Sequence, residues 1–142
     1  MMHVLVHDNG FHPDDLGPVE FFTLDRLARG VESPVPLMLE SDVDPAELPV
    51  YFPWISAIRI RFPSFDDGRG FSLAVRLRQL GYQGRLGATG HLISDQYPQA
   101  RRSGFDEVVI DELMAVRQPE PHWLAKSAWK SGDYQRHLLR SG

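Results

Sequence analysis

The pattern of hydrophobic and polar residues changes its period in the middle of the chain. Residues 57–62 alternate apolar and charged side chains, as a half-buried strand does. From residue 71 to residue 80 the apolar side chains instead follow helical spacing, at Phe71, Leu73, Ala74, Leu77 and Leu80. The change predicts a strand over 53–62, a helix over 71–80 that Gly81 ends, and a strand-to-helix turn between them.

The same rhythm of strand and helix repeats further along. We expect strands over 85–89 and 107–110, and between them a helix over 94–102 that Ser94 caps and Gly104 ends. Strands that alternate with helices of about ten residues pair in parallel through right-handed crossovers. The sequence therefore predicts an α/β protein with a mostly parallel sheet of βα repeats, either a flavodoxin-like open sheet or a half-barrel-like one.

Shorter elements precede this central part. They are a strand over 3–7, an edge hairpin through Asn9-Gly10, a helical segment over 21–28, a strand over 36–39 and a short helix over 42–48. The sequence has no repeat and no linker that would divide it. We therefore expect residues 1–142 to form a single domain.

The C-terminal segment, about residues 112–140, is predicted to be helical. One piece is expected over 113–117 and a second between 122 and 139. The aromatic side chains of this segment are Trp123, Trp129 and Tyr134. They either cover the sheet or form an apolar surface that joins two copies of the chain in a homodimer.

The composition limits the chemistry. The sequence contains no cysteine, which excludes disulfides, thiolate metal sites and a cysteine nucleophile. A cysteine-free chain is compatible with the reducing cytoplasm. The N-terminus lacks the basic and apolar regions of a signal peptide, and no apolar run approaches the ~20 residues that span a bilayer. We expect a cytoplasmic protein without membrane contact.

Charge is distributed unevenly along the chain, whose net charge is −4. Residues 1–58 contain ten acidic residues against two arginines, whereas residues 59–102 contain eight arginines against three acidic residues. Arginine suits carboxylates and phosphates, so the second block is compatible with an anionic ligand. The more ordinary interpretation is that these arginines pair with the acidic first block. A nucleic-acid surface is not expected of an acidic chain without a lysine-rich stripe.

The strand-to-helix turn concentrates polar and flexible residues. Its candidate ligand-binding residues are Asp66, Asp67, Gly68, Arg69, Gly70 and Ser72. In one interpretation Arg69 and the amides at the helix start hold sulfite, sulfate or phosphate. In the other, the aspartates shape the turn and pair with Arg69, while Ser72 only caps the helix. The turn lacks the glycine spacing of a nucleotide-binding loop.

Several short motifs follow one another in a fixed order along this part of the chain: Phe62-Pro63, Asp67-Gly68-Arg69-Gly70, Ser72-Leu73-Ala74, Gly81-Tyr82 and Gly104-Phe105-Asp106. In these motifs the chain resembles the bacterial family DUF934, whose members have no known function. The similarity extends from about residue 36 to residue 110. It implies a link to assimilatory sulfite reduction, because members are commonly encoded beside sulfite or nitrite reductase. The family usually has arginine, aspartate and cysteine where Gly87, His91 and Ser103 stand, and these departures bear on any inherited activity.

The expected sheet brings loops together at the carboxyl ends of its strands, where open parallel sheets bind ligands. His91 would there meet Asp67 or Asp95, and such a pair can move protons near neutral pH. We predict no metal or cofactor, since these loops lack a recognised ligand spacing. His3, His7 and His12 lie near the terminus and rank lower as candidates.

Three hypotheses follow from the sequence. The first is an accessory protein that binds a small anion or a reductase partner at the carboxyl ends of its strands. The second is a small enzyme that uses His91 with the neighbouring carboxylates. The third is a non-catalytic module that forms a homodimer.

Overall fold

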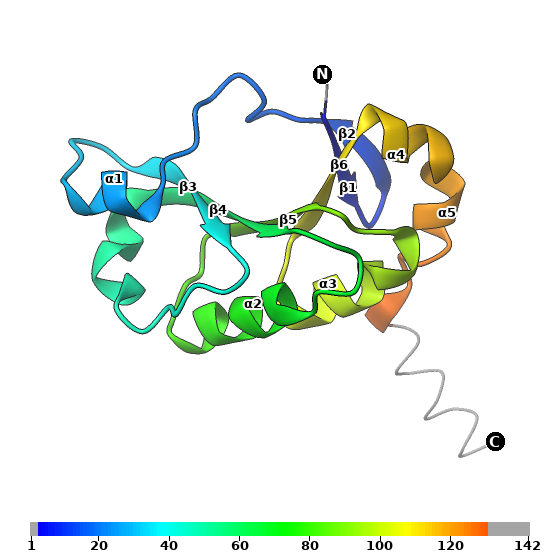
Figure 1. Ribbon diagram of the computed structural model, residues 1–142. Helices are drawn as coiled ribbons and strands as arrows, with labels where there is room; N and C mark the ends of the chain where they lie inside the picture. The colour runs from blue at the N-terminus through cyan, green and yellow to red at the C-terminus, as the bar shows by residue number, and fades with distance from the viewer. Residues whose placement is uncertain (1–2, 131–142) are drawn as a thin grey trace, which may run out of the picture.

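A computed structural model describes residues 3–130 and shows one open sheet of six strands (Figure 1). The strands are β1 (His3–His7), β2 (Gly10–Pro13), β3 (Val35–Glu40), β4 (Ile55–Phe62), β5 (Arg85–Gly90) and β6 (Glu107–Asp111). They lie in the order β2-β1-β6-β5-β4-β3. Strands β3 to β6 are parallel, and the β1–β2 hairpin adds to β6 in the antiparallel sense.

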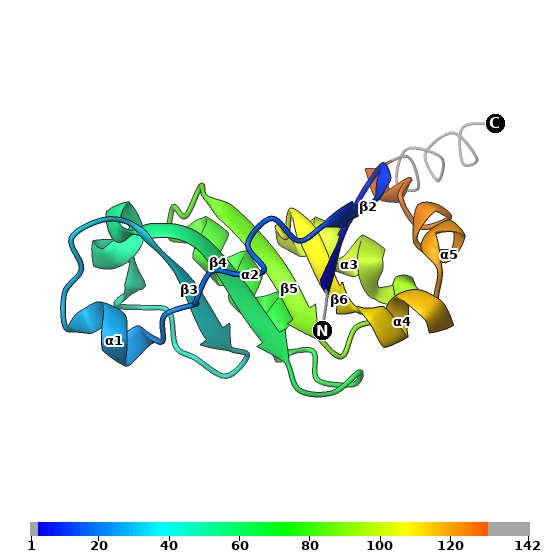
Figure 2. The ribbon, with the colours of Figure 1, turned by 90° about the horizontal axis from the view of Figure 1, so that it is seen from above.

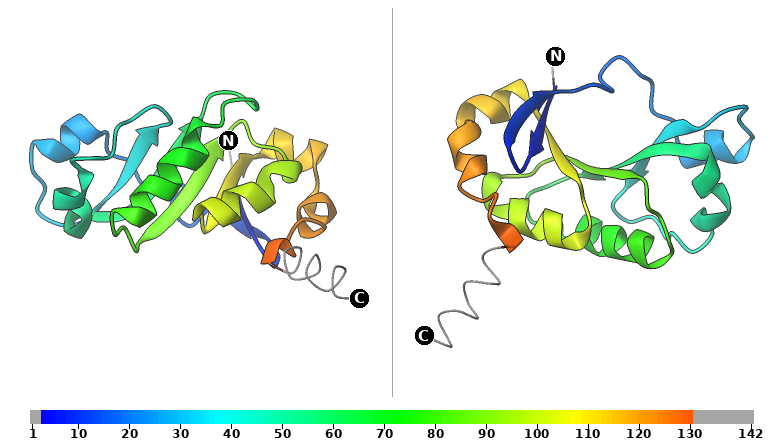
Figure 3. Two further views of the ribbon diagram at one scale, coloured as in Figure 1. Left: turned by 90° about the horizontal axis from the view of Figure 1, so that it is seen from below. Right: turned by 180° about the vertical axis from the view of Figure 1, so that it is seen from behind.

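The helices lie on one face of the sheet and at its two ends. They are α1 (Leu24–Ala28), α2 (Arg69–Gln79), α3 (Tyr97–Ser103), α4 (Glu112–Arg117) and α5 (Glu120–Leu124), with 3-10 turns η1 (Leu48–Trp54) and η2 (Ser94–Gln96). Helices α2 and α3 run side by side under the parallel strands, α1 lies near β3, and α4 and α5 lie near the hairpin (Figures 1 and 3). The core forms between the sheet and α2 and α3, where Phe62, Phe71 and Phe105 pack together.

The opposite face of the sheet, which we call the polar face, carries charged side chains. Side chains alternate along a strand, so the residues between the core positions point away from the helices. Arg59 of β4, Arg85 of β5 and Glu107 of β6 occupy such positions. Residues 14–21, which we call the strap, cross this face on the way from the hairpin to α1 (Figure 2).

The expected fold class is confirmed. The chain forms an α/β structure with a mostly parallel sheet, and strands and helices alternate from β4 to β6. Gly81 and Gly104 follow α2 and α3 in the left-handed conformation expected of helix-ending glycines. The parallel strands lie in chain order, so they contain no reversal of the kind at which doubly wound sheets bind ligands.

The expected helix over 42–48 is wrong. Asp44 instead forms a turn by accepting a hydrogen bond from the amide of Ala46, and the 3-10 turn η1 begins at Leu48. The Asp44 carboxylate competes for a backbone amide that a helix start would use otherwise, and this favours a turn over a helix here.

Both expected serine caps are also wrong. Helix α2 begins at Arg69, with Gly68 at its N-cap, so Ser72 lies inside the helix. Ser94 belongs to η2, is buried, and donates its amide hydrogen to the side chain of Gln118. Asp67 instead accepts the amide hydrogen of Arg69, the first residue of α2, and Gln96 accepts that of Ile93, which precedes η2.

The C-terminal segment is helical only in short pieces within the described residues. Trp123 of α5 is buried, packs edge-on against Tyr97 and donates to the carbonyl of Gln118. Trp129 donates to the carboxylate of Asp8. Both tryptophans thus make contacts within the chain, and Tyr134 lies outside the described residues. No helix over residues 3–130 is long and apolar enough to cross a membrane.

Candidate functional site

In the turn between β4 and α2, the charged side chains of Asp67 and Arg69 pair with each other. Asp67 accepts two hydrogen bonds from the Arg69 guanidinium, at 3.0 Å from Nε and 2.7 Å from Nη2, and a third from the Arg69 amide at 3.1 Å. Ser41 donates to the same carboxylate at 3.3 Å. These bonds to Arg69 lower the pKa of Asp67 to about 2. The arrangement is that of the second interpretation of this turn, in which the aspartate shapes the backbone and holds the arginine.

The other predicted residues of this turn also have local roles. Asp66 accepts a hydrogen bond from Ser64 at 2.6 Å. Gly70 lies under Phe62, where any Cβ would overlap the aromatic ring, so packing accounts for this glycine. Gly68 has open space around its Cα. The pattern Asp-Gly-Arg-Gly is therefore accounted for by a turn followed by a close helix–strand contact.

The two other predicted catalytic residues have different neighbours. His91 packs edge-on against Phe65, with ring centroids 5.3 Å apart. Asp95 pairs with Lys126 at 3.3 Å. Within the described part of the chain, no hydrogen bond or ion pair joins His91 to Asp67 or Asp95. The structure does not assemble the expected acid–base pair at this edge.

A different group of polar residues lines a hollow of about 660 Å³ on the polar face. The hollow lies between the β1–β2 hairpin and the amino ends of β5 and β6. It is lined by Leu5, His7, His12, Pro13, Asp15, Arg85, Asp106 and Glu107. This is the end of the parallel strands opposite to the one predicted from the sequence.

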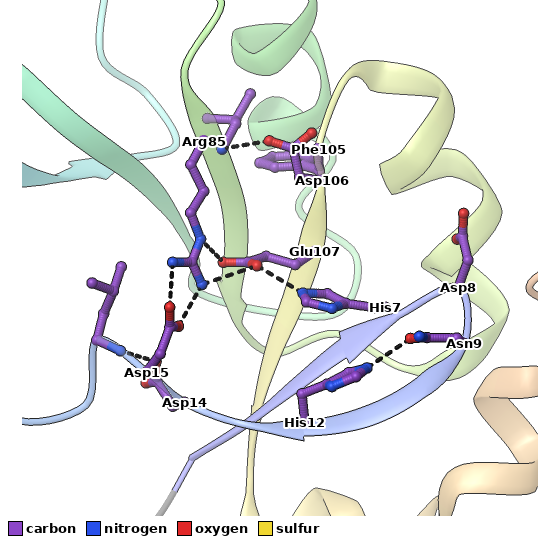
Figure 4. Close-up of polar contacts among 12 residues, drawn as sticks. His7, Asp8, Asn9, His12, Asp14, Asp15, Arg85, Phe105, Asp106 and Glu107 are labelled. Carbon is purple, nitrogen blue, oxygen red and sulfur yellow. Dashed lines mark hydrogen bonds and ion pairs between the residues drawn. The ribbon is translucent and has the colours of Figure 1, made fainter.

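Glu107 is the centre of the hollow's contacts (Figure 4). Its side chain is only 3% exposed and accepts hydrogen bonds from Arg85 at 2.9 Å and 3.1 Å. Its Oε1 atom also lies 2.9 Å from Nε2 of His7. A buried carboxylate is stable only when hydrogen-bonded and paired, and Arg85 and His7 together meet that need.

Arg85 links Glu107 to the strap. Its Nη1 and Nη2 atoms donate to the two oxygens of Asp15, at 2.9 Å and 2.7 Å. Hydrogen bonding to Asp15 raises the pKa of Arg85, and the same bonds lower the pKa of Asp15. A continuous chain of contacts therefore runs from Asp15 through Arg85 and Glu107 to His7.

The two histidines of the hairpin stand next to each other. The rings of His7 and His12 lie 4.6 Å apart, and Nε2 of His12 lies 2.6 Å from the side-chain oxygen of Asn9 (Figure 4). Because Nε2 of His7 meets a carboxylate, the proton of a neutral imidazole belongs on Nε2, which leaves Nδ1 as an acceptor. A histidine oriented by a buried carboxylate is the arrangement that general acid–base chemistry uses.

The hollow is acidic overall. Asp15, Asp106 and Glu107 carry three carboxylates, and Arg85 supplies the one guanidinium among the lining residues. Asp106 accepts hydrogen bonds from the amide of Leu86 and from Arg78. Among residues 3–130, no group of three or more histidine and carboxylate side chains is arranged to hold a metal ion.

Asp14 makes a second, buried pair with Arg59 beside the hollow. The Arg59 nitrogens lie 3.1 Å and 2.7 Å from the two oxygens of Asp14, and the side chains are only 7% and 4% exposed. Burial raises the pKa of Asp14, but the hydrogen bonds from Arg59 and from the Leu16 amide, together with the charge of Arg59, lower it by more, and the net shift is downward.

The acidic first block of the chain does pair with the arginine block. The pairs that join them are Asp8–Arg101, Asp14–Arg59, Asp15–Arg85, Glu40–Arg61 and Asp44–Arg76. The more ordinary interpretation of the charge pattern is thus confirmed for these arginines. In this structure their guanidinium groups already have carboxylate partners.

Sequence reasoning missed the hollow because its parts are far apart in the chain. One usable signal was present: Glu107 begins the otherwise apolar run Glu107–Ile110, and a charged residue at a buried strand position needs a partner. The partner histidine could not be identified in the same way, since nothing in the sequence says that β1 pairs with β6.

Comparison with known proteins identifies the family. Searches among curated proteins and among solved structures gave no significant match. A family model described as a bacterial protein of unknown function (DUF934) matches residues 36–140. The match includes Arg85 and Glu107, whereas the hairpin that supplies His7 and His12 precedes it. Since the family model covers most of the chain, the protein belongs to DUF934, a family of bacterial proteins of unknown function.

Proposed function

We propose that this DUF934 protein is an accessory protein that binds a small polar ligand in the hollow and exchanges a proton with it through His7. One observation carries the proposal: Nε2 of His7 lies 2.9 Å from a Glu107 carboxylate that is only 3% exposed. A buried carboxylate that binds one ring nitrogen holds the ring in one orientation and leaves the other nitrogen for a ligand. His7 itself is 37% exposed, so a ligand in the hollow can reach it.

The charges of the hollow define the class of ligand. Three carboxylates and one guanidinium favour a molecule that is neutral or cationic and donates hydrogen bonds. While the strap is in place, Arg85 is occupied by Asp15 and Glu107, so an anion such as sulfite that entered the hollow would meet carboxylates rather than a free guanidinium.

The cellular setting of the proposal comes from the family resemblance. We propose that the protein works beside assimilatory sulfite or nitrite reductase, and the genomic association of family members is the support for this part. The ligand would then be a small molecule that the reductase system uses or releases, and the reductase is the partner to test.

A ligand screen followed by nuclear magnetic resonance tests the site. The parent protein would be exposed to ammonium, the free amino acids, sulfite and nitrite, and the histidine ring signals recorded. We expect a ligand that shifts the His7 signals, with affinity at least ~10-fold lower in His7→Ala and Glu107→Gln. His91→Ala is the matched control, because it removes an exposed histidine at the other end of the strands.

The screen distinguishes a site at the amino ends of the parallel strands, where His7 lies, from a site at their carboxyl ends, where His91 lies. A ligand that shifts His91 and loses affinity only in His91→Ala would place the site at the carboxyl ends and overturn our proposal. Unchanged affinity in His7→Ala would overturn the role of His7. In cells, a deletion strain growing on sulfate should be restored by the parent gene and by His91→Ala but not by His7→Ala, and equal restoration by all three would count against the proposal.

A further inference from the structure

The strap is held to the sheet mainly by two consecutive carboxylates. Its backbone hydrogen bonds, from Gly17 to Asp14 and from Val19 to Leu16, stay within the strap. Most of its residues are exposed. Asp14 and Asp15 reach down to Arg59 and Arg85, and both arginines are bound through two nitrogens each. After the strap, Phe22 joins the sheet edge through a hydrogen bond to Pro36.

The two arginines belong to one surface. They project from the neighbouring strands β4 and β5 on the polar face, where Arg59 is paired with Gly87 and Arg85 with Ala57 in the register. Gly87 has no side chain to fill the space between them: a Cβ there would lie 3.5 Å from Cγ of Arg59 and 3.4 Å from Cγ of Glu107. Arg59 and Glu107 therefore pack over Gly87, and the polar face presents two guanidinium groups from neighbouring strands.

The strap does not supply a hydrogen-bond acceptor for every N–H group of Arg59. It is 5% exposed, and its Nε atom is buried without a hydrogen-bond partner. A buried donor without an acceptor destabilises the folded chain. Its other contacts are Asp14 and the Phe21 ring, 4.8 Å from the guanidinium carbon, and both belong to the strap. Arg59 thus has a donor to spare and depends on the strap for its partners.

A carboxylate and a tetrahedral oxyanion bind to the arginine fork in the same way, through two parallel N–H···O bonds. We propose that Arg59 and Arg85 form a binding site for an oxyanion of the sulfate or phosphate class, and that Asp14 and Asp15 of the strap occupy this site in the absence of the anion. The anion would displace the strap and take over its hydrogen bonds to the two guanidinium groups. This site goes beyond the proposed ligand of the hollow, although both use Arg85.

The other charged groups on this face are compatible with the proposal. Arg61 is paired with Glu40, Asp111 caps α4 by accepting from the Met114 amide, and Glu107 remains with Arg85 and His7 when the strap leaves. Among the described residues, Arg59 has no carboxylate partner other than Asp14. Release of the strap would therefore leave Arg59 as the main anchor for an anion, with Arg85 beside it.

Neutralising the strap tests this site. The double variant Asp14→Asn, Asp15→Asn should bind inorganic sulfate and phosphate at least ~10-fold more tightly than the parent in calorimetric titration, because two competing carboxylates are gone. Adding Arg59→Met to the double variant should abolish the gain. Asp44→Asn is the matched control, since it breaks the exposed Asp44–Arg76 pair elsewhere, and it should leave sulfate affinity unchanged.

A second measurement uses the parent protein, in case the double variant does not fold. Sulfate should increase amide hydrogen exchange at Leu16 and Val19, and chloride at equal ionic strength should not. Equal exchange in the two salts would overturn the proposal, as would a folded double variant that binds sulfate no better than the parent. His7→Ala should keep its sulfate response, so failure of the hollow and failure of this site give different results.

Discussion

The turn after β4 and the hollow beside the hairpin contain the same kinds of side chain, but they bring them together over different distances along the chain. Asp67 and Arg69 are two residues apart, whereas His7 and Glu107 are one hundred apart and Asp15 and Arg85 seventy apart. The turn satisfies its charges through local backbone geometry. The hollow exists only when β1, the strap, β5 and β6 have all reached their places in the sheet.

The two regions also differ in how strongly water screens their charges. The Arg69 side chain is 60% exposed, so its pair with Asp67 is largely screened. Glu107 is 3% exposed, and its contacts with Arg85 and His7 are largely shielded from water. A charge-rich motif in the sequence is therefore a weaker sign of a site than a buried charge whose partners come from distant segments.

Removing one carboxylate from each region should give the largest difference. Glu107→Ala should lower the free energy of unfolding by about 2–3 kcal/mol, because Arg85 and His7 lose a buried acceptor. Asp67→Ala should lower it by much less, since Arg69 returns to water. Urea unfolding of the two variants measures both values. Equal losses would show that burial does not distinguish the two regions.

Substitutions at the two glycines of the turn should differ in their effect on stability, by less than the two carboxylate substitutions do, because only one of these glycines is tightly packed. Gly70→Ala places a methyl group against the Phe62 ring and should destabilise the protein by about 1–3 kcal/mol. Gly68→Ala meets no atom within 4 Å and has a negative φ of −86°, so it should be neutral or slightly stabilising. Thermal unfolding of both variants tests this. A stable Gly70→Ala would mean that the helix–strand contact is looser than the structure shows.

Lowering the pH should reduce the free energy of unfolding through the carboxylates of both regions, and the contribution of the turn should be the smaller one. The pKa values of Asp14, Asp15 and Asp67 are lowered in the folded protein, that of Asp67 to about 2 from 3.8. The unfolded chain therefore binds protons first as the pH falls. The stabilisation is complete above about pH 4 and is lost as the pH falls through the folded pKa values.

Urea unfolding at a series of pH values measures this loss. We expect the midpoint to fall between about pH 4 and pH 2, and Asp67→Asn to remove only part of the pH dependence, because its partner Arg69 is 60% exposed and water screens the pair. The strap variant Asp14→Asn, Asp15→Asn should remove more of it. A midpoint that does not change with pH in the parent would contradict the role assigned to these pairs.

Much of the fold was predictable because it depends on neighbours in the sequence. The alternation over 57–62, the helical spacing from Phe71 to Leu80 and the glycines after α2 and α3 are local patterns, and the structure contains the strand, the helix and both helix ends. The predictions that failed were also local in scale. The Asp44 side chain forms a turn where a helix over 42–48 was expected, α2 begins before Ser72, and Ser94 lies in a 3-10 turn.

The sequence by itself determined the alternation of strands and helices, the family, and the two charge blocks that pair with each other. Only the tertiary structure decided that β1 lies against β6, and hence that His7 meets Glu107 at the amino ends of the parallel strands. The physical reason is that helix periods and turns are set by bonds between residues close in the chain. Strand order is set by packing and by hydrogen bonds between distant segments, which no local pattern encodes.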